Sequence, residues 1–128
     1  MTANVRELLQ LATILEANAA QAAEEMAAVV TRGALNVKEG WRSNAVASSG
    51  RHARRYPYSI SYDVTPIPGG ARAEIGPDKD KTQGPLGNLL EFGSVNNGGH
   101  NDGGRALLTE EPRFAAQVAL MTDRLGRL

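Results

Sequence analysis

The chain has 128 residues and a mass of 13.6 kDa, which is about the size of one domain. Its 14 Lys and Arg residues balance 14 Asp and Glu residues. This balance excludes a basic field over the whole protein that would attract nucleic acid, although a local patch stays open. Cysteine is absent, which excludes disulfides, Cys-ligated zinc and a thiol nucleophile.

The composition also points to self-association. Aromatic residues make up only 5% of the chain, and its 14 glycines are unevenly spread. We therefore expect a modest core that is completed in an oligomer. No apolar run approaches the ~18 residues that a membrane span needs, and Arg6, Glu7 and Glu16 interrupt the start of the chain. We expect neither a membrane segment nor a signal peptide.

The first 47 residues form a predicted helical half. The first thirty contain no glycine or proline, and apolar residues recur at the spacing of one helix face: Val5, Leu8, Ala12, Leu15, Ala19, Ala22, Met26 and Val29. The pattern predicts a helix over residues 4–31, about 42 Å long at ~1.5 Å per residue, with a stop or kink at Gly33. Such a helix either lies across a sheet in the core or packs its far end on a neighbouring subunit.

Residues 34–47 predict a second, shorter helix. Val37, Trp41 and Ala45 share one face, and Gly40 weakens the helix. We place Trp41, the only tryptophan, in the core in preference to a role in stacking on a ligand.

Residues 56–76 predict an antiparallel hairpin. Apolar and polar residues alternate from Tyr58 to Val64 and again from Ala71 to Ile75, which is the period of a half-buried strand. Pro66 to Gly70 supply the turn. The polar segments 76–84 and 94–104 are predicted loops, and we expect neighbouring subunits to order them.

Residues 112–128 predict a C-terminal helix. Phe114, Val118, Met121 and Leu125 fall on one face, and Pro112 suits a first helical turn. Glu110 and Glu111 would then cap its positive end. With a helical turn or strand entry at residues 85–92, residues 1–128 form one α+β domain: a long helix, a short helix, a hairpin or small sheet, and a C-terminal helix.

The sequence offers no constellation for catalysis. His52 lies among arginines, and His100 with Asp102 supplies too few ligands for a metal. Neither a Gly-x-Ser-x-Gly elbow nor a phosphate-binding glycine loop is present. We therefore expect no enzyme activity, no cofactor and no metal.

One charge asymmetry remains. Between residues 42 and 62 there is no acid, and four arginines are present: Arg42, Arg51, Arg54 and Arg55. We call these four residues the basic patch. Three roles stay open for the basic patch. It forms a solvated loop, makes salt bridges between subunits, or contacts DNA with the help of neighbouring tyrosines.

The segment from Gly84 to Ser94 carries a resemblance. An apolar pair is followed by Glu-aromatic-Gly-Ser, here Leu89, Leu90, Glu91, Phe92, Gly93 and Ser94. This motif resembles that of the small neck and tail-completion proteins of long-tailed bacteriophages (siphoviruses), which join the tail to the head. Element order agrees over nearly the full length. The chain departs from the family after the motif, where Asn96 to Gly104 replace a proline-rich turn.

The resemblance implies a non-enzymatic virion protein, made in the host cytoplasm and located in the neck or proximal tail. It implies a homo-oligomeric, hexamer-like ring that completes the tail, contacts other neck, connector and tail-tube proteins, and passes DNA. The basic patch would face the lumen or a subunit interface, and Glu91 would pair with an arginine within or between subunits. Alternatives are a tail-terminator ring, a minor tail component, or a small DNA-binding protein that uses residues 51–55.

Overall fold

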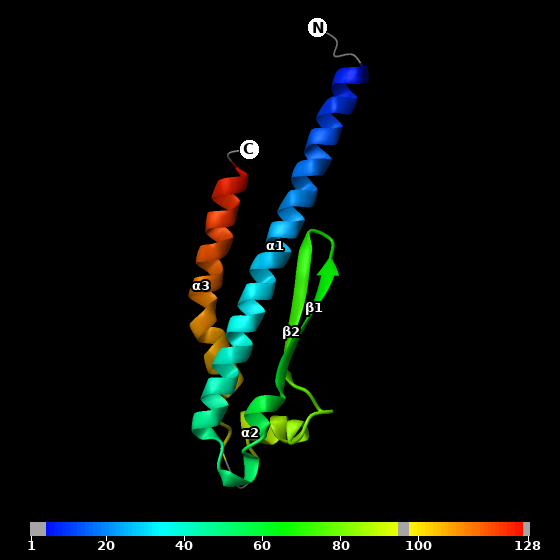
Figure 1. Ribbon diagram of the computed structural model, residues 1–128. Coiled ribbons are helices and arrows are strands. Elements are labelled where there is room, and N and C mark those ends of the chain that lie inside the picture. Colours follow the sequence, from blue (N-terminus) through cyan, green and yellow to red (C-terminus); the bar gives the residue numbers. More distant parts are fainter. Residues whose placement is uncertain (1–4, 95–97, 127–128) are drawn as a thin grey trace.

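The computed structural model describes residues 5–94 and 98–126. It contains a long helix, α1 (Val5–Ser48), a hairpin of β1 (Ile60–Ile67) and β2 (Gly70–Pro77), a short helix, α2 (Gly87–Phe92), and a final helix, α3 (Asp102–Leu125). In Figure 1, α3 runs along one side of α1 and the hairpin along another. The predicted α+β fold, with its long N-terminal helix, hairpin and C-terminal helix, is confirmed.

The two predicted N-terminal helices are one. α1 spans 44 residues without interruption, about 66 Å at ~1.5 Å per residue. A Cβ at Gly33 would lie 3.0 Å from the Phe114 ring, and one at Gly40 would lie 3.2 Å from the Cβ of Ala106. The expected break at Gly33 is therefore wrong, because both glycines are places where α3 packs directly on the backbone of α1.

The hairpin lays its apolar face on α1. Its register pairs Tyr62 with Ile75 and Val64 with Ala73, and these side chains are half-buried while the alternate Asp63 is exposed. The two strands are joined by Pro68 and Gly69, whose φ of +81° suits the second central position of a type II turn. The hairpin is as predicted, but Tyr58 lies before it, in a 3-10 turn (Tyr56–Ser59), and is exposed.

The densest core lies at one end of the molecule, where the C-terminal end of α1 meets the turns that follow it. Ala45, Ala53, Tyr56 and Ile60 are buried there, with Trp41, Ile75, Leu86 and Leu90 packed around them. The core position predicted for Trp41 is confirmed.

α3 begins ten residues earlier than predicted. Asp102 is its first residue, and Pro112 lies in its interior, so Glu110 and Glu111 do not cap its start. Glu110 is instead buried and accepts a hydrogen bond from Asn36 Nδ2 at 3.0 Å. The predicted apolar face is present, because Phe114, Val118 and Leu125 are half-buried and Met121 is buried. Among the described helices, none has an apolar stretch long enough to cross a membrane.

Candidate functional site

The motif Leu89–Ser94, which we call the family-like motif, has both buried and exposed side chains. Leu89 to Phe92 lie in α2, which follows a 3-10 turn (Gly84–Leu86) that begins the segment. Glu91 is buried at 8% exposure, whereas the Phe92 side chain is 78% exposed and Leu89 is 55% exposed. The acidic side chain of the motif is therefore buried in the fold, and two of its apolar side chains are exposed.

The Glu91 carboxylate binds the first turn of α3. Oε1 accepts a hydrogen bond from the amide of Gly103 at 3.0 Å, and Oε2 accepts one from Gly104 at 3.1 Å. The first four amides of a helix have no partner within the helix and carry partial positive charge. Glu91 satisfies two of them. The arginine partner expected within the subunit is wrong, because the described partners of this carboxylate are main-chain amides.

Main-chain hydrogen bonds also connect α2 to the residues just before α3. The amides of His100 and Asn101 donate to the carbonyls of Leu90 and Glu91 at 2.8 and 3.0 Å. A Cβ at Gly99 would come within 2.5 Å of the main chain of α2. Residues 99–104 of the predicted loop 94–104 are thus ordered by contacts within the same chain. Asp102 to Gly104 belong to α3. Its residues 95–97 lie outside the described residues.

Asp102 is the centre of a second buried cluster, which the sequence reasoning missed. Its side chain is 1% exposed. It accepts hydrogen bonds from Ser48 Oγ at 2.7 Å and from Arg105 at 2.6 Å, and its main-chain oxygen accepts from Asn44 at 3.0 Å. His100 Nδ1 lies 3.8 Å away. The cluster joins the last turns of α1 to the first turn of α3.

Two polar aromatic groups lie beside these acids. The hydroxyl of Tyr56 and the indole nitrogen of Trp41 are both buried without a hydrogen-bond partner of normal geometry. Burial raises the pKa of Tyr56, the nearby Trp41 side chain lowers it, and the negative charges of Glu91 and Asp102 raise it further. Nothing in this environment supplies a general base within hydrogen-bond reach of Tyr56.

The predicted loop 76–84 is a series of turns ordered within the chain. Asp78 N donates to Ser59 O at 2.8 Å, and further main-chain bonds join Lys81 to Asp78 and Gly84 to Lys81. Gln83 connects these turns to the basic patch, since its Oε1 accepts from the amides of Arg55 and Tyr56. Neighbouring subunits are not needed to order this segment.

The basic patch separates into one structural arginine and three exposed ones. Arg42 donates to the carbonyls of Pro57 and Ile60 at 3.1 and 3.2 Å, and its guanidinium lies 5.6 Å from the Tyr58 ring centroid. Arg51, Arg54 and Arg55 are exposed and have no acidic partner among the described residues. Only these three are free to meet another molecule.

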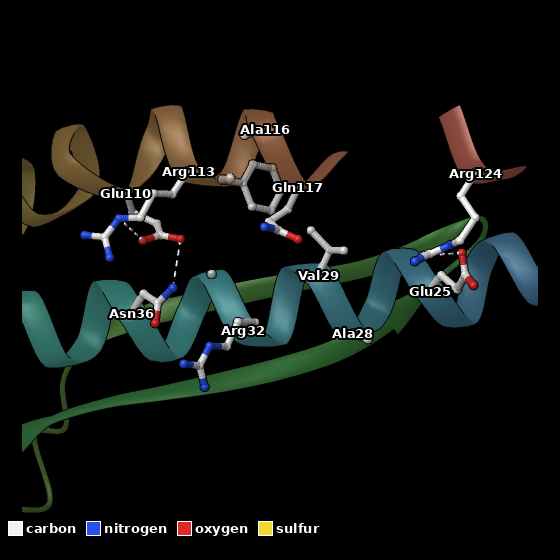
Figure 2. Close-up of a pocket in the computed structure, with 12 residues that line it drawn as sticks. Glu25, Ala28, Val29, Arg32, Asn36, Glu110, Arg113, Ala116, Gln117 and Arg124 are labelled. Atoms are coloured by element: carbon white, nitrogen blue, oxygen red, sulfur yellow. Dashed lines mark hydrogen bonds and ion pairs between the residues drawn. The ribbon is translucent and has the colours of Figure 1, made fainter. Parts of the chain in front are cut away.

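A groove of about 450 Å³ runs between α1 and α3. Figure 2 shows polar contacts at both ends of it: Asn36 and Arg113 bind Glu110 at one end, and Arg124 binds Glu25 at 3.0 Å at the other. Between them, Val29 and Phe114 and the small residues Ala28, Gly33 and Ala116 line the groove. The spacing of sequence motifs gave no signal of this groove, because it depends on where two distant helices meet.

Over residues 5–94 and 98–126, no three His, Asp or Glu side chains are gathered as a metal site would require. No protein-family model matches the chain, and neither a curated protein nor a solved structure matches it significantly.

Proposed function

We propose that this chain is a structural subunit of the neck or proximal tail of a long-tailed bacteriophage, forming a ring that completes the tail and joins it to the filled head. The observation that carries the proposal is the arrangement of the Leu89–Ser94 motif. Glu91 anchors α3 to α2, while Leu89 and Phe92 remain exposed on the same short helix.

This arrangement supports a recurring assembly motif better than a catalytic one. The acid of the motif is buried and accepts hydrogen bonds from two main-chain amides, which is a structural role. A side chain as large as Phe92 contributes strongly to association when a partner buries it. The motif therefore combines a fixed local structure with an apolar contact for a neighbour.

A second candidate function is binding of DNA, and the three exposed arginines favour it. Arg51, Arg54 and Arg55 lie close together in sequence and near exposed Tyr58. Such a group can neutralise phosphates without reading sequence. In the ring proposal this contact is with DNA that passes through the lumen. In a free DNA-binding protein it would be the main activity.

The experiment is to locate the chain in the virion. Purified virions are analysed by mass spectrometry and by electron microscopy with labelling of the chain, and a phage lacking the gene is examined in parallel. We expect label at the neck and, without the gene, filled heads and tails that accumulate unjoined. Absence of the chain from virions, together with normal joining in its absence, would show that the proposal is wrong.

A variant separates the motif from general folding. Phe92→Ser removes the exposed ring without touching the Glu91 contacts, so we expect a folded protein that fails to restore joining. Leu120→Ser is the matched control, because Leu120 is another exposed apolar residue outside the motif. Equal complementation by both variants would remove the role given to Phe92.

A further inference from the structure

The first turns of α1 project beyond the rest of the molecule. Gly70, at the hairpin turn, packs against Met26, and Arg124, near the end of α3, pairs with Glu25. Every side chain that the structure describes between Val5 and Gln21 is exposed, and Figure 1 shows these turns extending past both the hairpin and α3. We call residues 5–21 the arm. It is about 25 Å long at ~1.5 Å per residue.

The arm has the composition of a helix that needs a partner. Val5 and Leu9 are 72% and 63% exposed, and the sequence continues their face with Ala12, Glu16 and Ala19. Most helical stability in proteins comes from the packing of an apolar face, and the described side chains of the arm are all exposed. An apolar face of this kind normally lies in a groove of another molecule, with anchors at i, i+4 and i+7.

The groove between α1 and α3 has matching properties. Its centre is apolar at Val29 and at Phe114, whose ring packs on Gly33, and its walls carry the exposed Ala28 and Ala116, so a helix can approach these two alanines closely. Its charged residues are three arginines and two glutamates, whereas those of the arm are two glutamates and one arginine. The groove and the arm therefore both carry apolar residues and are opposite in net charge.

The arm cannot reach the groove of its own chain. α1 is one unbroken helix from Val5 to Ser48, and it forms both the arm and one wall of the groove. Any arm that lies in the groove must come from a second copy. Because arm and groove are different surfaces, the contact is heterologous and can repeat from copy to copy until a ring closes.

We propose that the arm of one copy packs into the groove between α1 and α3 of the next copy, with Glu16 of the arm facing Arg32 of the groove. Glu16 lies seven residues after Leu9 and so on the same helix face. Arg32 lines the groove and has no acidic partner among the described residues. This inference deepens the proposed function, on which it rests, because it names the two surfaces through which ring subunits meet.

Cross-linking tests the contact directly, since the chain has no cysteine of its own. Leu9→Cys and Ala116→Cys are purified separately, mixed, and treated with a short bismaleimide. We expect a product that contains one chain of each. Ala115→Cys is the matched control, because Ala115 is the neighbouring exposed alanine of α3 outside the groove, and its product with Leu9→Cys should be largely lost.

The other cross-linked products also test the proposal. The double variant Leu9→Cys/Ala116→Cys should give a ladder of covalent trimers and larger species. A product that stops at two chains would mean reciprocal exchange in a closed dimer and would overturn the one-way contact. A Leu9–Leu9 product would show that arms pair with arms, and the absence of any product would also overturn the proposal.

A charge exchange gives an independent readout. Glu16→Arg and Arg32→Glu should each reduce assembly in sedimentation measurements, and the double exchange should restore it. Failure of cross-linking and rescue with the chain still present in the virion neck would leave the proposed function standing without this interface. Success of both with the chain absent from virions would remove the function and keep the interface.

Discussion

The carboxylate of Glu91 lies 3.0 Å from the amide of Gly103, and this contact joins the family-like motif to the start of α3. A second bond, to Gly104 at 3.1 Å, makes the carboxylate act as a cap supplied from another helix. Caps of this kind satisfy amides that the helix itself cannot satisfy. The motif glutamate is therefore a structural residue, and Leu89 and Phe92 are exposed apolar residues of the motif.

Glu91→Ala should destabilise the protein by about 2 kcal/mol, because the buried amide of Gly103 and the partly buried amide of Gly104 lose their partner. Glu91→Gln keeps one acceptor and should lose less. Urea unfolding measures both changes. Glu111→Ala, on an exposed position of α3, is the control and should shift the free energy of unfolding by less than about 0.5 kcal/mol. Equal stability of wild type and Glu91→Ala would contradict the capping role.

Gly103→Ala should be destabilising by about 1–3 kcal/mol through overpacking. A Cβ there would lie 2.7 Å from the Trp41 ring and 2.8 Å from Glu91 Oε2. Since Trp41 is the only tryptophan, its fluorescence follows unfolding at this joint. Gly50→Ala is the control, because nothing lies within 4 Å of a Cβ at Gly50. If Gly103→Ala and Gly50→Ala unfold at the same temperature, the packing of Trp41 on Gly103 is not tight.

The fold class was predictable because the strongest patterns in the sequence are local. The heptad-like face of α1 and the alternation around Tyr62 each identify one element by its own periodicity. The helix boundaries were not predictable in the same way. Gly33 and Gly40 each cost a helix about 1 kcal/mol relative to alanine, but α3 packs against both of them, and this packing is invisible in a local window.

The same reason explains the errors at the candidate site. Pro112 indicated a helix start, yet α3 begins at Asp102 because Glu91, eleven residues earlier, and Ser48 in α1 bind its first turn. Glycines 99, 103 and 104 predicted a loose loop, whereas they allow the chain to pass close to α2, Trp41 and Asn101. The contact of Gly103 with Trp41 joins residues far apart in sequence, so composition alone predicted a loop.

Pro112→Ala should stabilise the protein by about 1–3 kcal/mol. Pro112 is exposed in the interior of α3, where proline removes a main-chain hydrogen bond and crowds the carbonyl four residues earlier. Thermal unfolding measures the change as a higher Tm. Pro85→Ala is the control, since Pro85 begins a 3-10 turn, where proline is favourable, and its removal should not stabilise. A lower Tm for Pro112→Ala would show that its ring makes contacts worth more than the lost helix bond.

Tyr56 should make the protein less stable at alkaline pH. Its pKa in the folded state is raised above the ordinary value of 10.0, chiefly by burial. The unfolded chain therefore releases this proton first, and the stabilisation present below pH 10 is lost as the pH rises toward the folded-state pKa. Tyr56→Phe lacks this loss, so its free energy of unfolding should rise relative to wild type above about pH 10.

The control for this effect is Tyr58→Phe, because Tyr58 is 60% exposed. Urea titrations at neutral and alkaline pH compare the three proteins. At neutral pH, Tyr56→Phe should differ little from wild type, since the buried hydroxyl has no hydrogen-bond partner of normal geometry. A constant difference between Tyr56→Phe and wild type at all pH values would show that the hydroxyl does not titrate differently on folding.

Replacing Arg51, Arg54 and Arg55 together by Gln should leave the fold intact, because their exposed side chains make no ion pair with the described residues. If the basic patch meets DNA, the variant should bind DNA more weakly, and the slope of log affinity against log salt should fall by about 3, one for each lost phosphate contact. Salt-dependent binding of fluorescent duplex DNA measures both quantities. A control that replaces the exposed Arg72 by Gln removes a charge outside the patch, the arm and the groove, and should leave the slope largely unchanged. Unaltered DNA affinity in the first variant, together with normal assembly and DNA retention in virions, would remove the patch from both the lumen and the subunit interface.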